Sequence, residues 1–227
     1  MCLTIAIDGP ASSGKSTIAK RLAERLGMTY LDTGAMYRAV TLYFMTHEVD
    51  VADAQQVCDA LEQINLSFEW IDGLQHIFLN GEDVSETIRT TAVTHFVSEV
   101  SAIESVRKLL VEKQQAMAQM GDVIMDGRDI GTVVLPQAKY KFFFTATPEV
   151  RAQRRFADNQ ARGIQDETLD EIREAIIARD LYDSTRTHSP LKKASDAIEI
   201  DTSHLTVDEV AELLFKRIQE QSAVSSE

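Results

Sequence analysis

The spacing of apolar residues along the chain predicts strands and helices in alternation. The apolar run at residues 3–7 predicts a short buried strand at 3–8. Apolar residues then recur every four positions over 15–26, as they do on one face of a helix. The alternation continues through a strongly apolar run at 141–145 and predicts an α/β fold with a parallel sheet and flanking helices. Further helices are predicted at 33–46, 51–61, 90–102, 106–120, 148–162, 167–180 and 207–219, and further strands at 28–31, 123–125 and 197–200.

One segment interrupts this alternation. Residues 64–84 contain short strand-like runs joined by Asp72-Gly73 and Asn80-Gly81, which are dipeptides typical of tight hairpin turns. Antiparallel hairpins fit poorly into a series of βα units, so we interpret the segment as a small inserted antiparallel sheet.

Composition narrows the classes of function. The net charge of −13 argues against nonspecific binding to a nucleic acid polymer, although local arginine clusters can still bind a small anion. Two cysteines are too few for a disulfide framework or a cysteine-based metal cluster. No apolar run approaches the length that spans a bilayer, and the first residues lack the basic segment of a signal peptide. The chain is therefore expected to be cytoplasmic, with no membrane partner.

The strongest motif lies between the first predicted strand and helix. Gly9 to Ser16 fits G-x-x-x-x-G-K-S, the phosphate-binding P-loop, in the strand–loop–helix context that the motif requires. Backbone N–H groups at the start of the helix point at phosphate oxygens, Lys15 reaches the β- and γ-phosphates, and the Ser16 hydroxyl ligates Mg²⁺. The alternative is a glycine-rich turn before an ordinary helix. The predicted ATP-binding residues are Gly9, Pro10, Ala11, Ser12, Ser13, Gly14, Lys15, Ser16 and Thr17.

A second candidate anion site follows the second predicted strand. Thr33 and Arg38 place a hydroxyl and a guanidinium near the start of a helix, and together these groups can bind an anion. The alternative is that Thr33 caps the helix while Arg38 lies on its solvated face. The residues alone favour neither interpretation.

The segment Asp126–Thr132 (DGRDIGT) lies at the carboxyl end of a predicted strand, where open α/β sheets bind ligands. Asp126 is suited to hold the hydration shell of Mg²⁺, Arg128 to bind phosphate, and Asp129 to accept a hydrogen bond from an amino group on a base. A turn with a local Arg–Asp pair is the alternative, and we favour the functional interpretation.

A third group of residues is rich in arginine. A mobile lid can carry arginines to the charge that develops during phosphoryl transfer. For any single arginine, a solvated helix face is the simpler explanation, and several acidic residues nearby are possible partners. The group comprises Arg151, Arg154, Arg155 and Arg162, followed by Arg179 and Arg186 on either side of Asp183.

Together these motifs resemble the bacterial cytidylate kinase family over nearly the full length of the chain. The resemblance rests on GPASSGKST at 9–17, LDTGAMYR at 31–38, GEDVSETIR at 81–89, DGRDIGT at 126–132 and RDLYDSTR at 179–186. The P-loop is shared by many families, whereas the other four strings in this order are far more specific. The inserted sheet at 64–84 resembles part of the family's extended nucleoside-monophosphate-binding arm.

The resemblance implies roles for individual residues. Many family members carry Ser where this chain has Thr33, which keeps the hydroxyl and adds a methyl group. Tyr182 and Ser184 replace residues that are often charged in the family. The implied catalytic residues are Lys15, Arg128, Arg154 and Arg179, and the implied acceptor-binding residues are Thr33, Arg38, Ser98, Arg107, Arg128, Asp129, Arg179, Asp183 and Arg186. Ser16 and, through water, Asp126 are the implied Mg²⁺ ligands.

The resemblance also implies an organisation and a reaction. We expect residues 1–227 to form one P-loop kinase domain with a monophosphate-binding arm at about 33–107 and a helical lid at 148–166. The implied reaction transfers the γ-phosphoryl group of ATP to CMP or dCMP with Mg²⁺, in a monomer. The alternatives are another small-molecule P-loop kinase, of the UMP/CMP or shikimate type, and a nucleotide-dependent regulatory module.

Overall fold

The computed structural model describes residues 2–224 and divides the chain into two compact units. The first unit runs to Leu31 and resumes at Gln115, and the second is Asp32–Gln114. The arm predicted at 33–107, with its sheet insert at 64–84, falls inside the second unit.

A parallel sheet of five strands forms the centre of the first unit, in the order β2-β6-β1-β7-β8. The pairs β1–β6, β1–β7 and β7–β8 are parallel, which confirms the fold class predicted from the apolar pattern. The strands are β1 (Thr4–Asp8), β2 (Thr29–Asp32), β6 (Val123–Gly127), β7 (Tyr140–Thr145) and β8 (Ile198–Asp201).

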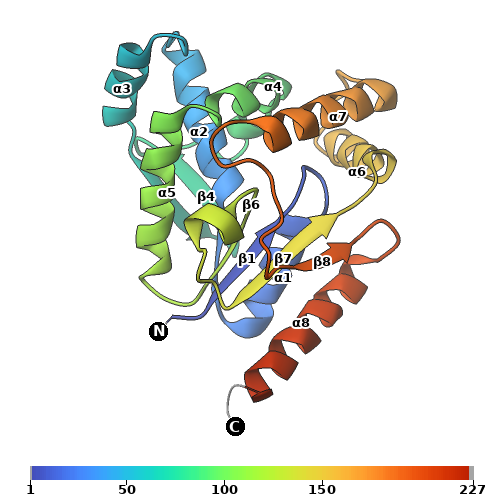
Figure 1. The fold of residues 1–227 in the computed structure, drawn as a ribbon. Helices are drawn as coiled ribbons and strands as arrows, with labels where there is room; N and C mark the ends of the chain where they lie inside the picture. The colour runs from blue at the N-terminus through green and yellow to red at the C-terminus, as the bar shows by residue number, and fades with distance from the viewer. Residues whose placement is uncertain (1, 225–227) are drawn as a thin grey trace. The chain divides into compact units, whose positions relative to one another are not determined.

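Two helices, α1 (Lys15–Leu26) and α8 (Val207–Val224), pack against this sheet and against each other (Figure 1). Their apolar faces supply Ile18, Leu22 and Leu214 to a core with the strand residues Ile5 and Phe142. Burial of such side chains is the main stabilising contribution to the unit. No helix among residues 2–224 is both long and apolar enough to cross a membrane.

A second helix pair in this unit consists of α6 (Pro148–Ala161) and α7 (Leu169–Thr185), which pack together through Ala152, Ile172 and Ile176. The helix predicted at 167–180 is therefore five residues longer at its carboxyl end. The extension places Asp183 inside the helix, one turn after Arg179.

The second unit combines helices with a small antiparallel sheet, β3 (Leu66–Ile71), β4 (Leu74–Leu79) and β5 (Glu82–Asp83). Both predicted hairpin turns are confirmed, since Asp72-Gly73 and Asn80-Gly81 all have positive φ, as two-residue hairpins prefer. The helices are α2 (Thr33–Thr46), α3 (Ala54–Glu62), the 3₁₀ turn η1 (Thr87–Arg89), α4 (Thr91–Val100) and most of α5 (Glu104–Ala118).

The sheet register brings two loops to one edge of the first unit. Asp8, the last residue of β1, pairs with Gly127, the last residue of β6. The P-loop after β1 and the segment after β6 therefore leave the sheet side by side. A single π-helical turn, Ile130–Val134, follows β6 in a segment where no helix was predicted.

Candidate functional site

The P-loop has the backbone geometry that its glycines permit. Gly9 has a φ of 145°, and a Cβ atom there would lie 2.2 Å from the Phe144 carbonyl oxygen of β7, so only glycine fits. Gly14 adopts the left-handed conformation immediately before α1. Among the other predicted ATP-binding residues, Thr17 lies exposed on the first turn of α1.

Lys15 lies almost fully buried under this loop. Its Nζ donates to the Pro10 carbonyl oxygen at 2.6 Å and to Ser13 Oγ at 3.3 Å. Burial, together with the nearby Arg128, lowers the pKa of Lys15 to about 7, and the carboxylates of Asp126 and Asp8 offset part of this effect. The ammonium group is therefore poorly solvated and strongly disposed to pair with an anion at the loop.

Asp126, at the end of β6, is held by two hydroxyl groups. Tyr30 Oη donates to Oδ1 at 2.7 Å, and Ser16 Oγ donates to Oδ2 at 2.8 Å. The structure thus brings the two predicted Mg²⁺ ligands together. A hydroxyl and a carboxylate are the oxygen donors that Mg²⁺ prefers, and one carboxylate suits an ion held largely by water and nucleotide phosphates. The residues present fit the ion.

The neighbouring Asp8 carboxylate bonds to the segment after β6. It accepts hydrogen bonds from the backbone N–H groups of Ile130 at 2.8 Å and Gly131 at 2.7 Å. Burial raises the pKa of Asp8 to about 6, although these two hydrogen bonds act in the opposite direction. Asp129, the predicted base-reading residue, is buried immediately before the same turn.

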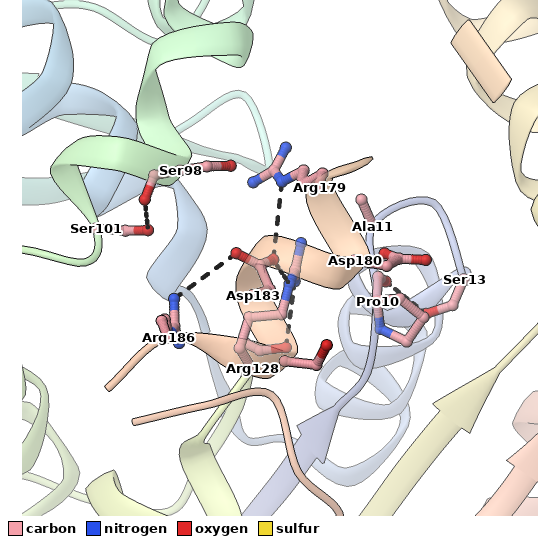
Figure 2. Close-up of polar contacts among 12 residues, drawn as sticks. Pro10, Ala11, Ser13, Ser98, Ser101, Arg128, Arg179, Asp180, Asp183 and Arg186 are labelled. Atoms are coloured by element: carbon pink, nitrogen blue, oxygen red, sulfur yellow. Dashed lines mark hydrogen bonds and ion pairs between the residues drawn. The ribbon is translucent and has the colours of Figure 1, made fainter. Parts of the chain in front are cut away.

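Three arginines surround Asp183. Figure 2 shows Arg128, Arg179 and Arg186 pointing toward its carboxylate, at N–O distances of 3.1, 3.8 and 3.7 Å. Burial acts to raise the pKa of Asp183, but the three guanidinium groups outweigh it and lower the pKa below its ordinary value. Three guanidinium groups thus lie around one buried carboxylate, and guanidinium groups are well suited to bind phosphate.

Two arginines of α6, Arg151 and Arg154, are hydrogen-bonded to the P-loop directly or through Thr202. Arg151 is buried and forms a bidentate ion pair with Asp180 on α7, and it also donates to the Ala11 carbonyl oxygen at 3.3 Å. Arg154, predicted to be catalytic, donates to Thr202, whose hydroxyl in turn donates to the Ser13 carbonyl oxygen. The catalytic role of Arg154 stays a prediction.

In the second unit, Asp32 caps α2 by accepting from the Ala35 N–H at 2.9 Å. The alternative in which Thr33 serves as the cap is therefore wrong, and Thr33 is the buried first residue of the helix. Arg38 lies 3.6 Å from the Asp32 carboxylate and is largely buried rather than solvated. The two residues remain predicted ligands of the acceptor phosphate.

Arg107 and Ser98 belong to α5 and α4 of the same unit. The guanidinium of Arg107 is buried, lies over the Tyr37 ring at 5.2 Å and donates to the Ser101 carbonyl oxygen at 3.1 Å. Ser98 is partly buried, and its carbonyl oxygen accepts from Ser101 Oγ, as Figure 2 shows. Ser101 thus bonds to both residues.

Sequence reasoning did not assign a site role to Tyr30, Asp8 or Asp180. Asp8 carried a usable signal, since it is a charged residue at the carboxyl end of an apolar strand beside a phosphate-binding loop. Tyr30 and Asp180 carried none, because their partners Asp126 and Arg151 lie far away in the sequence.

Similarity to solved structures supports the class that these features indicate. A shikimate kinase from Bacteroides thetaiotaomicron aligns with a TM-score of 0.52 at 13% identity, over 96% of this chain and 99% of that one. An uncharacterized protein from Eubacterium ventriosum aligns with a TM-score of 0.51 at 12% identity, over 97% and 99% of the two chains. At such identities the likeness shows the fold alone. The fold and the P-loop site together define a P-loop kinase.

Sequence relatives identify the family. The family model for cytidylate kinase matches residues 5–220. A cytidylate kinase from Lactobacillus gasseri is 50% identical over 96% of this chain and 95% of its own length. Those from Limosilactobacillus fermentum and Bacillus thuringiensis are 48% and 47% identical, over 96% and 92% of this chain and 96% and 93% of theirs. The chain belongs to the cytidylate kinase family, and the family resemblance found in its motifs is confirmed.

Proposed function

We propose that the protein transfers the γ-phosphoryl group of ATP to CMP or dCMP. Family membership supports the reaction class and the acceptor. The observation that carries the proposal for the site is the sheet register, which pairs Asp8, the residue before the P-loop, with Gly127, the residue before Arg128. Arg128 in turn donates to Asp183. We therefore propose that the P-loop lysine and the arginine cluster act on the same phosphate groups.

The donor half is the P-loop, residues 9–17. Its backbone N–H groups at the start of α1 bind the anionic oxygens of ATP, and Lys15 exchanges its bonds to Pro10 and Ser13 for bonds to phosphate. Ser16 and Asp126 would hold Mg²⁺ together with the nucleotide, where the ion would supply positive charge to neutralise the phosphates.

The acceptor half is proposed from the residues that match the family's motifs. The α-phosphate of CMP is expected to bind guanidinium groups, and the cytosine amino group is expected to donate to the Asp129 carboxylate. Asp183, among its arginines, is suited to accept from a sugar hydroxyl. The proposed acceptor ligands are Thr33, Arg38, Ser98, Arg107, Arg128, Asp129, Arg179, Asp183 and Arg186.

The chemistry requires no general base. An oxygen of the CMP phosphate, already ionised at neutral pH, attacks the γ-phosphorus, and the bond from that phosphorus to the β,γ-bridging oxygen breaks to release ADP. Catalysis then consists of positioning and charge neutralisation by Lys15, Arg128, Arg154 and Arg179. The segment at 148–166, which contains α6, acts as a lid that excludes water and so limits ATP hydrolysis.

A panel of acceptors tests this function. Purified protein is incubated with ATP, Mg²⁺ and CMP, dCMP, UMP or AMP in turn, and ADP formation is followed by a coupled assay. CMP and dCMP should give rapid ADP formation. Slow ADP release that is independent of every acceptor would indicate a regulatory ATPase, and preference for UMP or a non-nucleotide acceptor would indicate another small-molecule kinase.

We further propose a monomer that acts on small nucleotides in the cytoplasm and binds neither a membrane nor a nucleic acid polymer. The net charge of −13 supports the absence of nucleic acid binding. Sedimentation equilibrium should give the mass of one chain, 25.3 kDa, across a hundredfold range of concentration.

A further inference from the structure

The π-helical turn Ile130–Val134 is capped by a residue far away in the sequence. Asp8, at the end of β1, accepts from the first two backbone N–H groups of the turn at 2.8 and 2.7 Å. Its carboxylate is almost fully buried, so solvent does not compete for these bonds. Ionised acceptors make the stronger class of hydrogen bond to backbone N–H groups.

The residue in the capping position, Asp129, does not cap the turn. An Asp at this position ordinarily accepts from N–H groups of the first helical turn. Asp32 and Asp53 do so in this chain, with extended backbones at ψ of 92° and 102°. Asp129 instead has φ of −143° and ψ of 23°, and its side chain makes no capping hydrogen bond. Asp8 therefore performs for this turn the role that the residue in the capping position performs for α2 and α3.

The close approach of Asp8 depends on Gly131. A Cβ atom at this glycine would lie 3.3 Å from Asp8 Oδ2 and 3.2 Å from Cδ of Lys141. Both distances are tighter than ordinary contacts, so a side chain at this position would displace the carboxylate. Because Gly131 has no side chain, the Asp8 carboxylate can reach the turn.

We propose that Asp8 is a positioning residue for base recognition: by capping the turn after β6, it keeps the Asp129 carboxylate from folding back onto its own backbone and directs it to the base of the acceptor. The proposal rests on the proposed function, in which Asp129 reads cytosine. Asp8 is also the residue before Gly9, so a single side chain links the loops of the donor and acceptor halves.

The backbone of Asp8 is fixed independently of its side chain. Asp8 pairs with Gly127 on one side and with Phe143 on the other within the sheet. A change of side chain at this position should therefore leave the P-loop backbone in place. A substitution at Asp8 can therefore change base selection, measured as the CMP/UMP ratio of kcat/KM, without changing KM for ATP.

The test measures kcat/KM for CMP and UMP in the wild type, Asp8→Asn, Asp129→Ala and the double variant. Asn keeps the size of Asp but turns an N–H₂ group toward one of the two backbone N–H groups. Asp8→Asn should lower the CMP/UMP ratio about tenfold, the effect of losing one good hydrogen bond to a charged group, while KM for ATP changes less than about twofold. In the Asp129→Ala background, Asp8→Asn should not change the ratio further, because Asp8 acts through Asp129.

Asp122→Asn is the matched control. Asp122 accepts from the Leu3 N–H at 2.6 Å, so it is a carboxylate bonded to backbone at the opposite end of the same two strands. The CMP/UMP ratio of kcat/KM in the Asp122→Asn variant should equal that of the wild type. If Asp8→Asn fails to fold, Gly131→Ala perturbs the same contact from the other side and should lower the ratio about threefold.

The outcomes separate the two proposals. A wild type that does not phosphorylate CMP overturns the proposed function. The role of Asp8 alone is overturned if the wild type selects CMP, Asp129→Ala loses this selection, and a folded Asp8→Asn variant keeps it. Additive losses in the double variant, or an unchanged ratio in Gly131→Ala, also contradict the proposal.

Discussion

Tyr30 donates its hydroxyl to Asp126 Oδ1 at 2.7 Å, and this bond sets the orientation of the carboxylate that faces Ser16. Tyr30 is fully buried at the start of the adjacent strand β2, whereas Asp126 ends β6. Groups that hydrogen-bond to a carboxylate near a metal ion commonly fix its orientation. The second oxygen of Asp126 therefore points in a defined direction. Tyr30 is thus a candidate positioning residue for Mg²⁺.

Tyr30→Phe should therefore raise the Mg²⁺ concentration for half-maximal activity about three- to tenfold, because Asp126 loses the partner that orients it. The kcat at saturating Mg²⁺ should change little. Tyr140→Phe is the control, since Tyr140 is also buried and donates to the Ile218 carbonyl oxygen at 3.1 Å. Both variants should lose about 1 kcal/mol of unfolding free energy, but only Tyr30→Phe should shift the Mg²⁺ titration. Equal Mg²⁺ titrations would refute the role of Tyr30.

Lys15→Ala should reduce kcat by about two to three orders of magnitude, because the developing charge on the phosphate oxygens loses the cation that we propose at the P-loop. The fold should remain intact, since removing a buried ammonium group with a lowered pKa also removes a desolvation penalty. Steady-state kinetics and thermal unfolding measure the two effects. Near-normal CMP-dependent turnover in this variant would contradict the role of Lys15.

Substitutions at Asp129 should change base selection in a graded way. Asp129→Ala removes the proposed acceptor for the cytosine amino group and should lower the CMP/UMP ratio of kcat/KM. Asp129→Asn also supplies an N–H₂ donor, which matches the carbonyl oxygen of uracil, so it should lower the ratio further than Ala. Equal ratios in the two variants and the wild type would show that Asp129 does not contact the base.

The raised pKa of Asp8 predicts a specific dependence of stability on pH. Because the folded state binds the proton more tightly than the unfolded state, Asp8 contributes stability below about pH 4 that is lost as the pH rises through about 6. Relative to Asp8→Asn, the wild type should lose about 2–3 kcal/mol of unfolding free energy between pH 4 and 7. Urea unfolding at several pH values measures the difference. A constant difference would show that burial does not penalise the Asp8 charge.

Local signals predicted most of the fold. The helix at Lys15–Leu26 has the predicted bounds because its apolar stripe and Gly27 act within the segment itself. Both hairpin turns were found because their dipeptides determine the backbone conformation locally. The end of α7 was missed because its last turns, with Asp183 and Ser184, carry polar residues that do not continue the apolar stripe.

The site was only partly predictable for a different reason. The P-loop and the arginine-bearing strings are contiguous motifs, so their residues were named from the sequence. The contacts that orient them join distant residues: Asp8 with Gly131, Tyr30 with Asp126, and Arg151 with Asp180. The π-helical turn could not be predicted because its cap lies on another strand.

The most direct test of the account follows the γ-phosphoryl group itself. Protein, Mg²⁺ and ATP labelled at the γ-phosphate are mixed with and without CMP, and the products are separated. The account predicts that the label appears in CDP with little inorganic phosphate, and that Lys15→Ala slows this transfer by about two to three orders of magnitude. Release of the label as inorganic phosphate at the same rate with and without CMP would contradict the central claim.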